Sequence, residues 1–231
     1  MQWWRSRAGL SSSAGYPGLI TLPDPPGASV LAGLEPRLCT VPVGTALARV
    51  YYTASGRPLW WNEFRSFGPL NFRWDHHVAT AAGGPVEQAR GVFYAATDAT
   101  TCLAEVFQAT RRVDRVYQAP WLVVFKTQGP LVLLDLTSDY PAQVGASMAI
   151  HSGNRHRARA WARDLYDAYP GAQGIRYASA ACGGAPAFAL TERALRAPLL
   201  PAHPEFHRAL ADDILLDPLK HAAQSIGYAL R

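Results

Sequence analysis

Four short segments between residues 48 and 106 decide the fold of this chain: Ala-Arg-Val-Tyr-Tyr at 48–52, Asn-Phe-Arg-Trp at 71–74, Gly-Val-Phe-Tyr-Ala-Ala-Thr-Asp at 91–98 and Cys-Leu-Ala-Glu-Val at 102–106. The first and third are rich in β-branched and aromatic residues, which is typical of strands. Asp98 is a typical helix N-cap, and Leu103, Val106 and Phe107 follow it at the spacing of one helical face. These segments therefore predict two strands and a helix.

The rest of the chain mixes strands and helices without a regular βαβ rhythm. Strands are predicted at 45–53, 91–96, 174–180 and 187–190, and 121–126 and 130–135 are predicted to pair with each other across Thr-Gln-Gly. Helices are predicted at 155–169, 207–215 and 219–229. The fold class is therefore α+β, with a compact mixed or antiparallel β core flanked by helices.

Turn residues divide the chain into three parts. Residues 1–44 carry Ser-Ser-Ser-Ala-Gly and Asp-Pro-Pro-Gly and are expected to form an irregular N-terminal extension. Residues 45–200 are expected to form the main domain. Residues 201–231 are expected to be a helical tail packed on that core. The extension is a candidate for regulation or for binding a partner.

Composition and charge restrict the class of partner. The chain has 231 residues, 49% of them apolar and 17% charged, which is typical of a globular protein with one sizeable core. Its formal charge is +5, and nearly all basic residues are arginine. That balance favours an anionic partner, namely a nucleotide, a nucleic acid or an acidic protein. Nucleic acid is disfavoured because no basic run with interleaved aromatics is present.

The cysteines and the apolar runs argue against a metal site, export and a membrane span. Cys39, Cys102 and Cys182 are widely spaced and form no ligand pattern, and the adjacent His76 and His77 lack further ligands. Three reduced thiols and the lack of a secretory signal predict a cytoplasmic protein, and export by a route that needs no signal stays an alternative. No apolar stretch reaches the length that a bilayer requires, so no membrane association is expected.

The polar side chains of the opening segments suit a dinucleotide such as NAD. Arginine forks, here Arg49 and Arg73, hold phosphates. An aromatic face such as Tyr94 holds a base or a nicotinamide ring. A lone carboxylate, Glu105, stabilises a developing cation. Each also has a structural interpretation, because edge arginines pair with carboxylates and core tyrosines are common.

Five blocks follow one another in an order that resembles the RES domain family, named for its arginine, glutamate and serine. They are Arg49, Phe72-Arg73-Trp74, the Val-x-Tyr-x-Ala strand at 92–96, Ala104-Glu105-Val106, and Gly-Ile-x-Tyr-x-Ser-Ala followed by Gly-Gly at 174–184. The resemblance covers about residues 46 to 193. These domains are mostly toxins of bacterial toxin–antitoxin pairs and are similar to ADP-ribosyltransferases.

The resemblance implies an ADP-ribosyltransferase-like fold and an enzyme that breaks NAD⁺ down by glycohydrolysis or phosphorolysis. The catalytic residues it implies are Arg49, Glu105 and a serine, for which Ser179 and Ser152 are both candidates. It also implies binding residues: Arg73, Trp74, Tyr94 and Tyr51. NAD⁺ would be the substrate, with no metal or other cofactor, and an antitoxin or immunity protein would be the partner. ADP-ribosyl transfer to a protein and a non-catalytic binding module remain alternatives.

Overall fold

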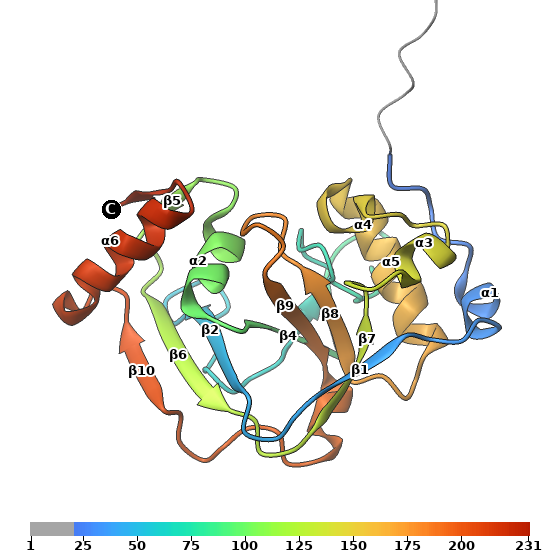
Figure 1. Cartoon of the computed structure of the whole chain (residues 1–231), viewed down its shortest axis with the longest axis horizontal. Coiled ribbons are helices and arrows are strands. Elements are labelled where there is room, and N and C mark those ends of the chain that lie inside the picture. Colours follow the sequence, from blue (N-terminus) through green and yellow to red (C-terminus); the bar gives the residue numbers. More distant parts are fainter. Residues whose placement is uncertain (1–20) are drawn as a thin grey trace, which may run out of the picture.

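A large sheet organises the computed structural model, which describes residues 21–231. Eight of its strands lie in the order β1 (Leu38–Val41), β7 (Leu131–Asp135), β8 (Gly174–Ala178), β9 (Pro186–Thr191), β4 (Val86–Ala96), β2 (Ala46–Tyr52), β6 (Pro120–Lys126) and β10 (Phe206–Ala209) (Figure 1). A ninth strand, β3 (Arg65–Gly68), pairs with β4. The pair β7–β8 is parallel and the other pairs are antiparallel. The predicted mixed, mostly antiparallel core is confirmed.

Helices cover the sheet in two groups. Figure 1 shows α2 (Ala99–Phe107) and α6 (Leu216–Ser225) beside β2 and β6, and α3 (Tyr140–Gln143), α4 (Ala149–Ser152) and α5 (Arg155–Ala168) beside β7 and β8. Helix α1 (Ala28–Ala32) lies against α5. A small parallel sheet joins β5 (Arg112–Val113) to β11 (Ala229–Leu230). Within residues 21–231, no helix is long and apolar enough to cross a bilayer.

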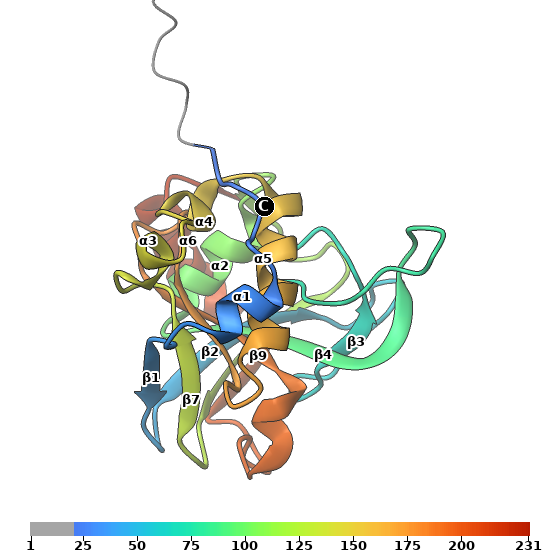
Figure 2. The same cartoon turned by 90° about the vertical axis from the view of Figure 1, so that its right-hand side faces the viewer.

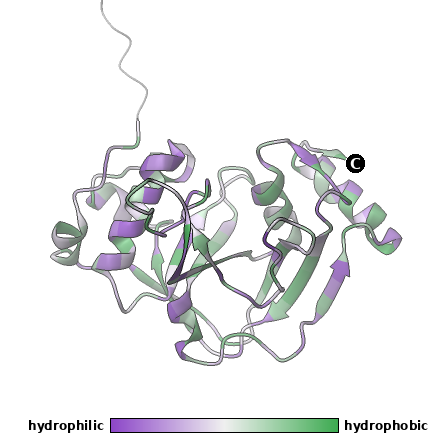
Figure 3. Cartoon of the chain, turned by 180° about the vertical axis from the view of Figure 1, so that it is seen from behind, coloured by the Kyte–Doolittle hydropathy of each residue, from purple (hydrophilic) through white to green (hydrophobic). Residues whose placement is uncertain are grey.

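The sheet is almost divided between β2 and β4. These strands share one residue pair, Ala48 with Ala96, whereas β2 pairs with β6 along its whole length and β4 pairs with β9 from Val92 onward. One core lies under the helices and contains Leu103 and Trp161. A second core lies on the opposite face of the strands. Figure 3 shows the strands between these cores mainly in the hydrophobic colour.

Some predicted elements are confirmed and others are wrong. The first strand, the helix capped by Asp98 and the helix at 155–169 are present. The predicted pairing of 121–126 with 130–135 is wrong, because β6 lies between β2 and β10 whereas β7 lies between β1 and β8. Residues 207–215 are not a helix: β10 covers 206–209 and a 3₁₀ turn follows at Asp213–Leu215.

The predicted boundary at residue 44 also differs from the structure. Strand β1, at Leu38–Val41, belongs to the sheet, and α1 precedes it. The irregular extension therefore does not reach residue 44, and its residues 1–20 lie outside the described part of the chain. The segment after residue 200 likewise supplies an edge strand, β10, and not only helices.

The close approach of β8 and β9 at Gly174 yields a stability prediction. A Cβ on Gly174 would lie 2.6 Å from the Ala189 carbonyl oxygen and 2.7 Å from the Leu190 Cα, both of which are backbone atoms. We expect Gly174→Ala to lower the free energy of unfolding by about 1–3 kcal/mol, because one strand must shift. Urea unfolding measures this. Gly171→Ala is the control, since nothing lies within 4 Å of its Cβ position, and equal losses in both variants would contradict the prediction.

Candidate functional site

Glu105 lies on α2, where two hydroxyl groups hold its carboxylate. Asp98 starts the helix by accepting a hydrogen bond from the Thr101 amide at 2.8 Å. About two turns later, Glu105 accepts a hydrogen bond from the Ser179 hydroxyl at 2.5 Å and one from the Tyr177 hydroxyl at 3.2 Å. Both donors are buried, whereas Glu105 is partly exposed. The site therefore presents one oriented carboxylate towards solvent.

Helix α6 and the residues after it support the same part of α2. The Tyr228 hydroxyl donates to the Ala104 carbonyl oxygen at 3.2 Å. The Cys102 thiol donates to the Ala48 carbonyl oxygen of β2 at 2.9 Å, and burial raises the pKa of that thiol. The part of α2 that carries Glu105 is thus held on one side by Tyr228, near the end of the sequence, and on the other side by strand β2.

Aromatic side chains line the surroundings of this carboxylate. The Trp74 ring lies 5.3 Å from the Tyr177 ring, and the Tyr94 ring lies 5.7 Å from that of Phe72, measured between centroids. Among residues 21–231, the Tyr94 hydroxyl and the Trp74 Nε1 are buried and have no hydrogen-bond partner. Burial and the nearby Asp75 charge raise the pKa of Tyr94, so its hydroxyl stays protonated. Two unused donors therefore lie in this wall.

Arg73 places a cation near Glu105. Its Nη1 donates to the Gly153 carbonyl oxygen at 2.8 Å and to that of Ile150 at 3.3 Å. Burial and the charge of Arg155 lower the pKa of Arg73, whereas the charge of Glu105 acts in the opposite direction. Within residues 21–231, Arg73 forms no salt bridge. Carbonyl groups orient this guanidinium without neutralising it.

Arg49 is a second cation of the same kind. It follows Ala48 at the division between β2 and β4, and only 5% of it is exposed. Its guanidinium lies 3.9 Å from the centre of the Phe93 ring, and its Nη1 donates to the Glu63 carbonyl oxygen at 3.0 Å. Burial lowers its pKa to about 9, which keeps it charged at neutral pH. Arg49 has no hydrogen bond to Glu105, and its ring partner, Phe93, belongs to the second core and not to the core under α2.

A buried carboxylate fixes the loop that carries Arg73 and Trp74. Asp75 is fully buried and accepts hydrogen bonds from the Arg65 Nη2 at 2.8 Å, the Leu70 amide at 2.7 Å and the His77 ring. Burial alone would raise the pKa of Asp75, but the His77 hydrogen bond and the Arg65 charge lower it to about 2. This loop is therefore held by an ionised group.

The remaining predicted site residues lie elsewhere. Ser152 is exposed at the end of α4, so the structure brings Ser179, and not Ser152, to Glu105. Tyr51 is buried, and its hydroxyl lies 2.6 Å from the His207 Nε2. Among residues 21–231, no three histidine, cysteine, aspartate or glutamate side chains are grouped to hold a metal ion.

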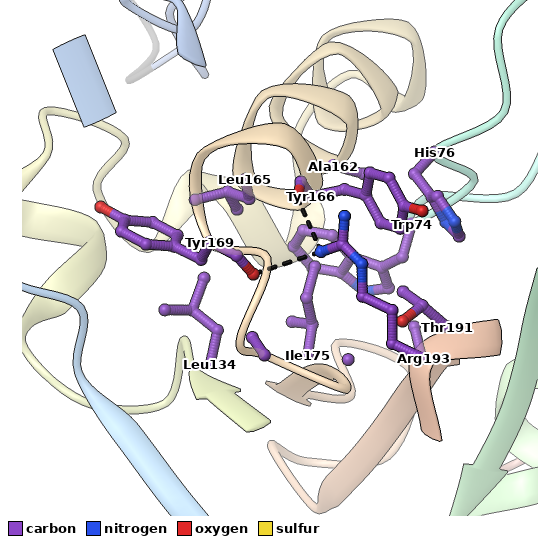
Figure 4. Close-up of a pocket in the computed structure, with 13 residues that line it drawn as sticks. Trp74, His76, Leu134, Ala162, Leu165, Tyr166, Tyr169, Ile175, Thr191 and Arg193 are labelled. Atoms are coloured by element: carbon purple, nitrogen blue, oxygen red, sulfur yellow. Dashed lines mark hydrogen bonds between the residues drawn. The ribbon is translucent and has the colours of Figure 1, made fainter. Parts of the chain in front are cut away.

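A small cavity lies behind the aromatic wall. Trp74, His76 and Arg193 help to line it, and the Arg193 Nη1 donates to the carbonyl oxygens of Tyr166 and Tyr169 (Figure 4). Its volume of about 20 Å³ suits one water molecule and excludes a nucleotide. Neither Glu105 nor Ser179 lines it, so the candidate site is the group of polar residues around Glu105 and not this cavity.

Two site residues were missed from the sequence alone. Tyr177 lies two residues before Ser179, and the alternation of a strand places both on one face, so their spacing was a usable signal. Asp75 gave no signal, because its burial depends on Arg65 and His77 folding around it.

Comparisons with known proteins agree with this architecture. The sequence profile of the RES domain matches residues 49–213. One chain of the crystal structure of the M. tuberculosis MbcT–MbcA toxin–antitoxin complex superposes with a TM-score of 0.53 at 16% sequence identity, over 83% of this chain and 96% of that one. At that identity the likeness shows the fold. A comparison with curated proteins finds no match.

The low pKa of Asp75 predicts a pH-dependent contribution to stability. A carboxyl whose pKa falls from 3.8 to about 2 on folding stabilises the protein by about 2–3 kcal/mol above pH 4, and this is lost as the pH falls through 2. Asp75→Asn should therefore be less stable at pH 7, and the difference from wild type should shrink between pH 4 and pH 2. Urea unfolding across this range tests it. Asp167→Asn, which removes a half-exposed partner of Arg90, is the control, and a difference independent of pH would contradict the prediction.

Proposed function

The chain belongs to the RES domain family, and on that premise we propose that it is a toxin that consumes NAD⁺ by cleaving the bond between nicotinamide and ribose. The observation that carries the proposal is one carboxylate, Glu105, held by two hydroxyl groups and close enough to the Arg73 guanidinium to affect its pKa. Within residues 21–231, no carboxylate pairs with that guanidinium. Cleavage of NAD⁺ uses both features. The guanidinium suits its pyrophosphate, and the carboxylate suits the positive charge that develops on its ribose. The site of action that we propose is the cytoplasm, where the substrate is available.

The reaction needs little acid catalysis. As the bond between C1′ and the ring nitrogen breaks, its electron pair moves to the nicotinamide, which leaves as a neutral molecule, and the ribose becomes oxocarbenium-like. Glu105 stabilises that cation more than it stabilises the neutral sugar. Water or phosphate then bonds to C1′; with water, a proton is released. Ser179 and Tyr177 hold the carboxylate oxygens in place throughout.

Binding is assigned to the two arginines and the aromatic wall. Arg49 and Arg73 bind the phosphate groups, because each has donors that face no carboxylate. The aromatic faces of Tyr94 and Trp74 would pack against the nicotinamide ring or a ribose, because their polar atoms are buried. Tyr51, whose hydroxyl is taken by His207, is left out of this assignment.

A protein partner is part of the proposal. An unrestrained NAD⁺-consuming enzyme harms the cell that makes it, so an antitoxin would restrain it. The similar M. tuberculosis structure is that of a toxin–antitoxin complex. Basic residues suited to an acidic partner lie at Arg111, Arg112, Arg155, Arg159 and Arg163, none of which forms a salt bridge within residues 21–231.

Incubation of the purified protein with NAD⁺ tests the activity. Release of free nicotinamide supports the proposal, and its dependence on added phosphate separates phosphorolysis from hydrolysis. Transfer of labelled ADP-ribose to protein would instead support a transferase. A folded protein that binds NAD⁺ but releases no nicotinamide would be a non-catalytic module, and the proposal would be withdrawn.

The role of Glu105 predicts a selective loss of turnover. Glu105→Gln should lower kcat by about a hundredfold or more while KM changes little, because the charge acts mainly in the transition state. In cells, expression of the active chain alone should deplete NAD⁺ and stop growth, and Glu105→Gln should relieve both effects. Glu87→Gln, at an exposed glutamate paired with Arg57, is the control. Full turnover with only a lower melting temperature would make Glu105 a structural residue.

The two unpaired arginines predict a second pattern. Arg49→Ala and Arg73→Ala should each cost about 2–4 kcal/mol in kcat/KM, because a charge-assisted fork to phosphate is lost. Lysine at either position should restore activity only in part, since it lacks the planar fork. Arg208→Ala, which removes an exposed arginine paired with Asp212, should have no effect. Near-normal kcat/KM in both alanine variants would exclude the assignment.

A further inference from the structure

The segment before α1 is packed along α5 through backbone carbonyl groups. The Leu22 carbonyl oxygen accepts a hydrogen bond from the Arg157 Nη1 at 2.7 Å, and that of Pro23 accepts one from the Trp161 Nε1 at 2.9 Å. Asp24 adds an ion pair with Arg157 at 3.2 Å. Figure 2 shows this segment, in blue, beside α5. Only 1% of Leu22 is exposed, so its side chain is part of the core.

The Leu22 side chain lies against Gly153, where it leaves no room for a side chain. A Cβ built on Gly153 would lie 3.0 Å from the Leu22 Cβ and 2.7 Å from the Ala149 carbonyl oxygen. The Gly153 amide also donates to that carbonyl oxygen at 2.7 Å. Gly153 is therefore confined between the N-terminal segment on one side and α4 on the other.

The carbonyl group of Gly153 provides the shorter of the two hydrogen bonds that hold Arg73. Its oxygen lies 2.8 Å from the Arg73 Nη1, and the other acceptor, on Ile150, lies at 3.3 Å. We propose that Leu22 is a positioning residue for the nucleotide site, because it fixes the carbonyl group that aims Arg73. This inference rests on the proposed function for its ligand, NAD⁺.

The electrostatics explain why Arg73 needs this support. No carboxylate pairs with Arg73 in the described part of the chain. The charge of Arg155 repels the Arg73 guanidinium. A guanidinium in that situation moves towards solvent unless short hydrogen bonds hold it. Loss of the Gly153 contact would leave the longer bond to Ile150 alone, and the free face of the fork would turn away from the phosphate.

Leucine variants of the full chain test the inference through enzyme kinetics. Leu22→Ala should raise KM for NAD⁺ about threefold or more with kcat nearly unchanged, and the effect should disappear in an Arg73→Ala background, because coupled residues are not additive. Leu31→Ala is the matched control: Leu31, in α1, is as deeply buried as Leu22, but its carbonyl accepts a hydrogen bond from the Tyr169 hydroxyl at the far end of α5. Leu22→Met, which keeps a large apolar side chain, should have the KM of the wild type. An equal rise in KM for Leu31→Ala, or a full Leu22 effect without Arg73, would overturn the inference.

Amide hydrogen exchange provides a readout that needs no substrate. Leu22→Ala should speed exchange at the Gly153 amide, and Leu31→Ala should leave it protected. If the wild-type protein released no nicotinamide but exchange changed in this way, the proposed function would fail and the positioning contact would stand. Unchanged exchange at Gly153 in Leu22→Ala would refute the contact whatever the activity.

Discussion

The pairing of Ala48 with Ala96 is the constraint on which the rest of the structure depends. It is the one register pair between β2 and β4, so the two halves of the large sheet are joined at two small residues. Helix α2 lies against this junction through the Cys102–Ala48 hydrogen bond. Arg49 is the next residue after Ala48 on β2. Glu105 lies on α2, three residues after Cys102, which bonds to Ala48. A single joint therefore sets the positions of the cation and of the carboxylate.

Arginine serves two different purposes in this fold. Arg65 pairs with Asp75 and fixes the loop beside the site. Arg90 pairs with Asp167 and fixes the strand beside it. Arg49 and Arg73 are held by carbonyl groups instead. A carbonyl group accepts a hydrogen bond without cancelling the charge, so these two cations remain available to an anion. Burial of the Arg49 charge is unfavourable, and in the proposed function a bound phosphate would offset that penalty.

Local features were predictable from the sequence, and long-range pairing was not. Asp98 and the apolar spacing after it placed α2 correctly, since a cap and a helical face are local signals. The short link at 127–129 suggested a hairpin, but Thr127 bonds to Pro42 and Gln128 bonds to Leu199, so the chain leaves β6 for another part of the sheet. Residues 206–209 form a strand because they pair with the edge of β6 that β2 leaves free, and this pairing joins residues far apart in the sequence. The choice between Ser179 and Ser152 likewise required a spatial neighbour, Glu105.

The hydrogen bond from Tyr228 to the Ala104 carbonyl joins residues 124 positions apart. A ribosome adds about 5–20 residues per second, so α2 waits about 6–25 s after its synthesis before this support arrives. During that interval the segment that carries Glu105 lacks one of its tertiary anchors. Assembly of the carboxylate site is therefore ordered in time, because the helix that carries Glu105 is made before the residue that anchors it. For the toxin proposed above, this delay would give a partner protein time to bind co-translationally.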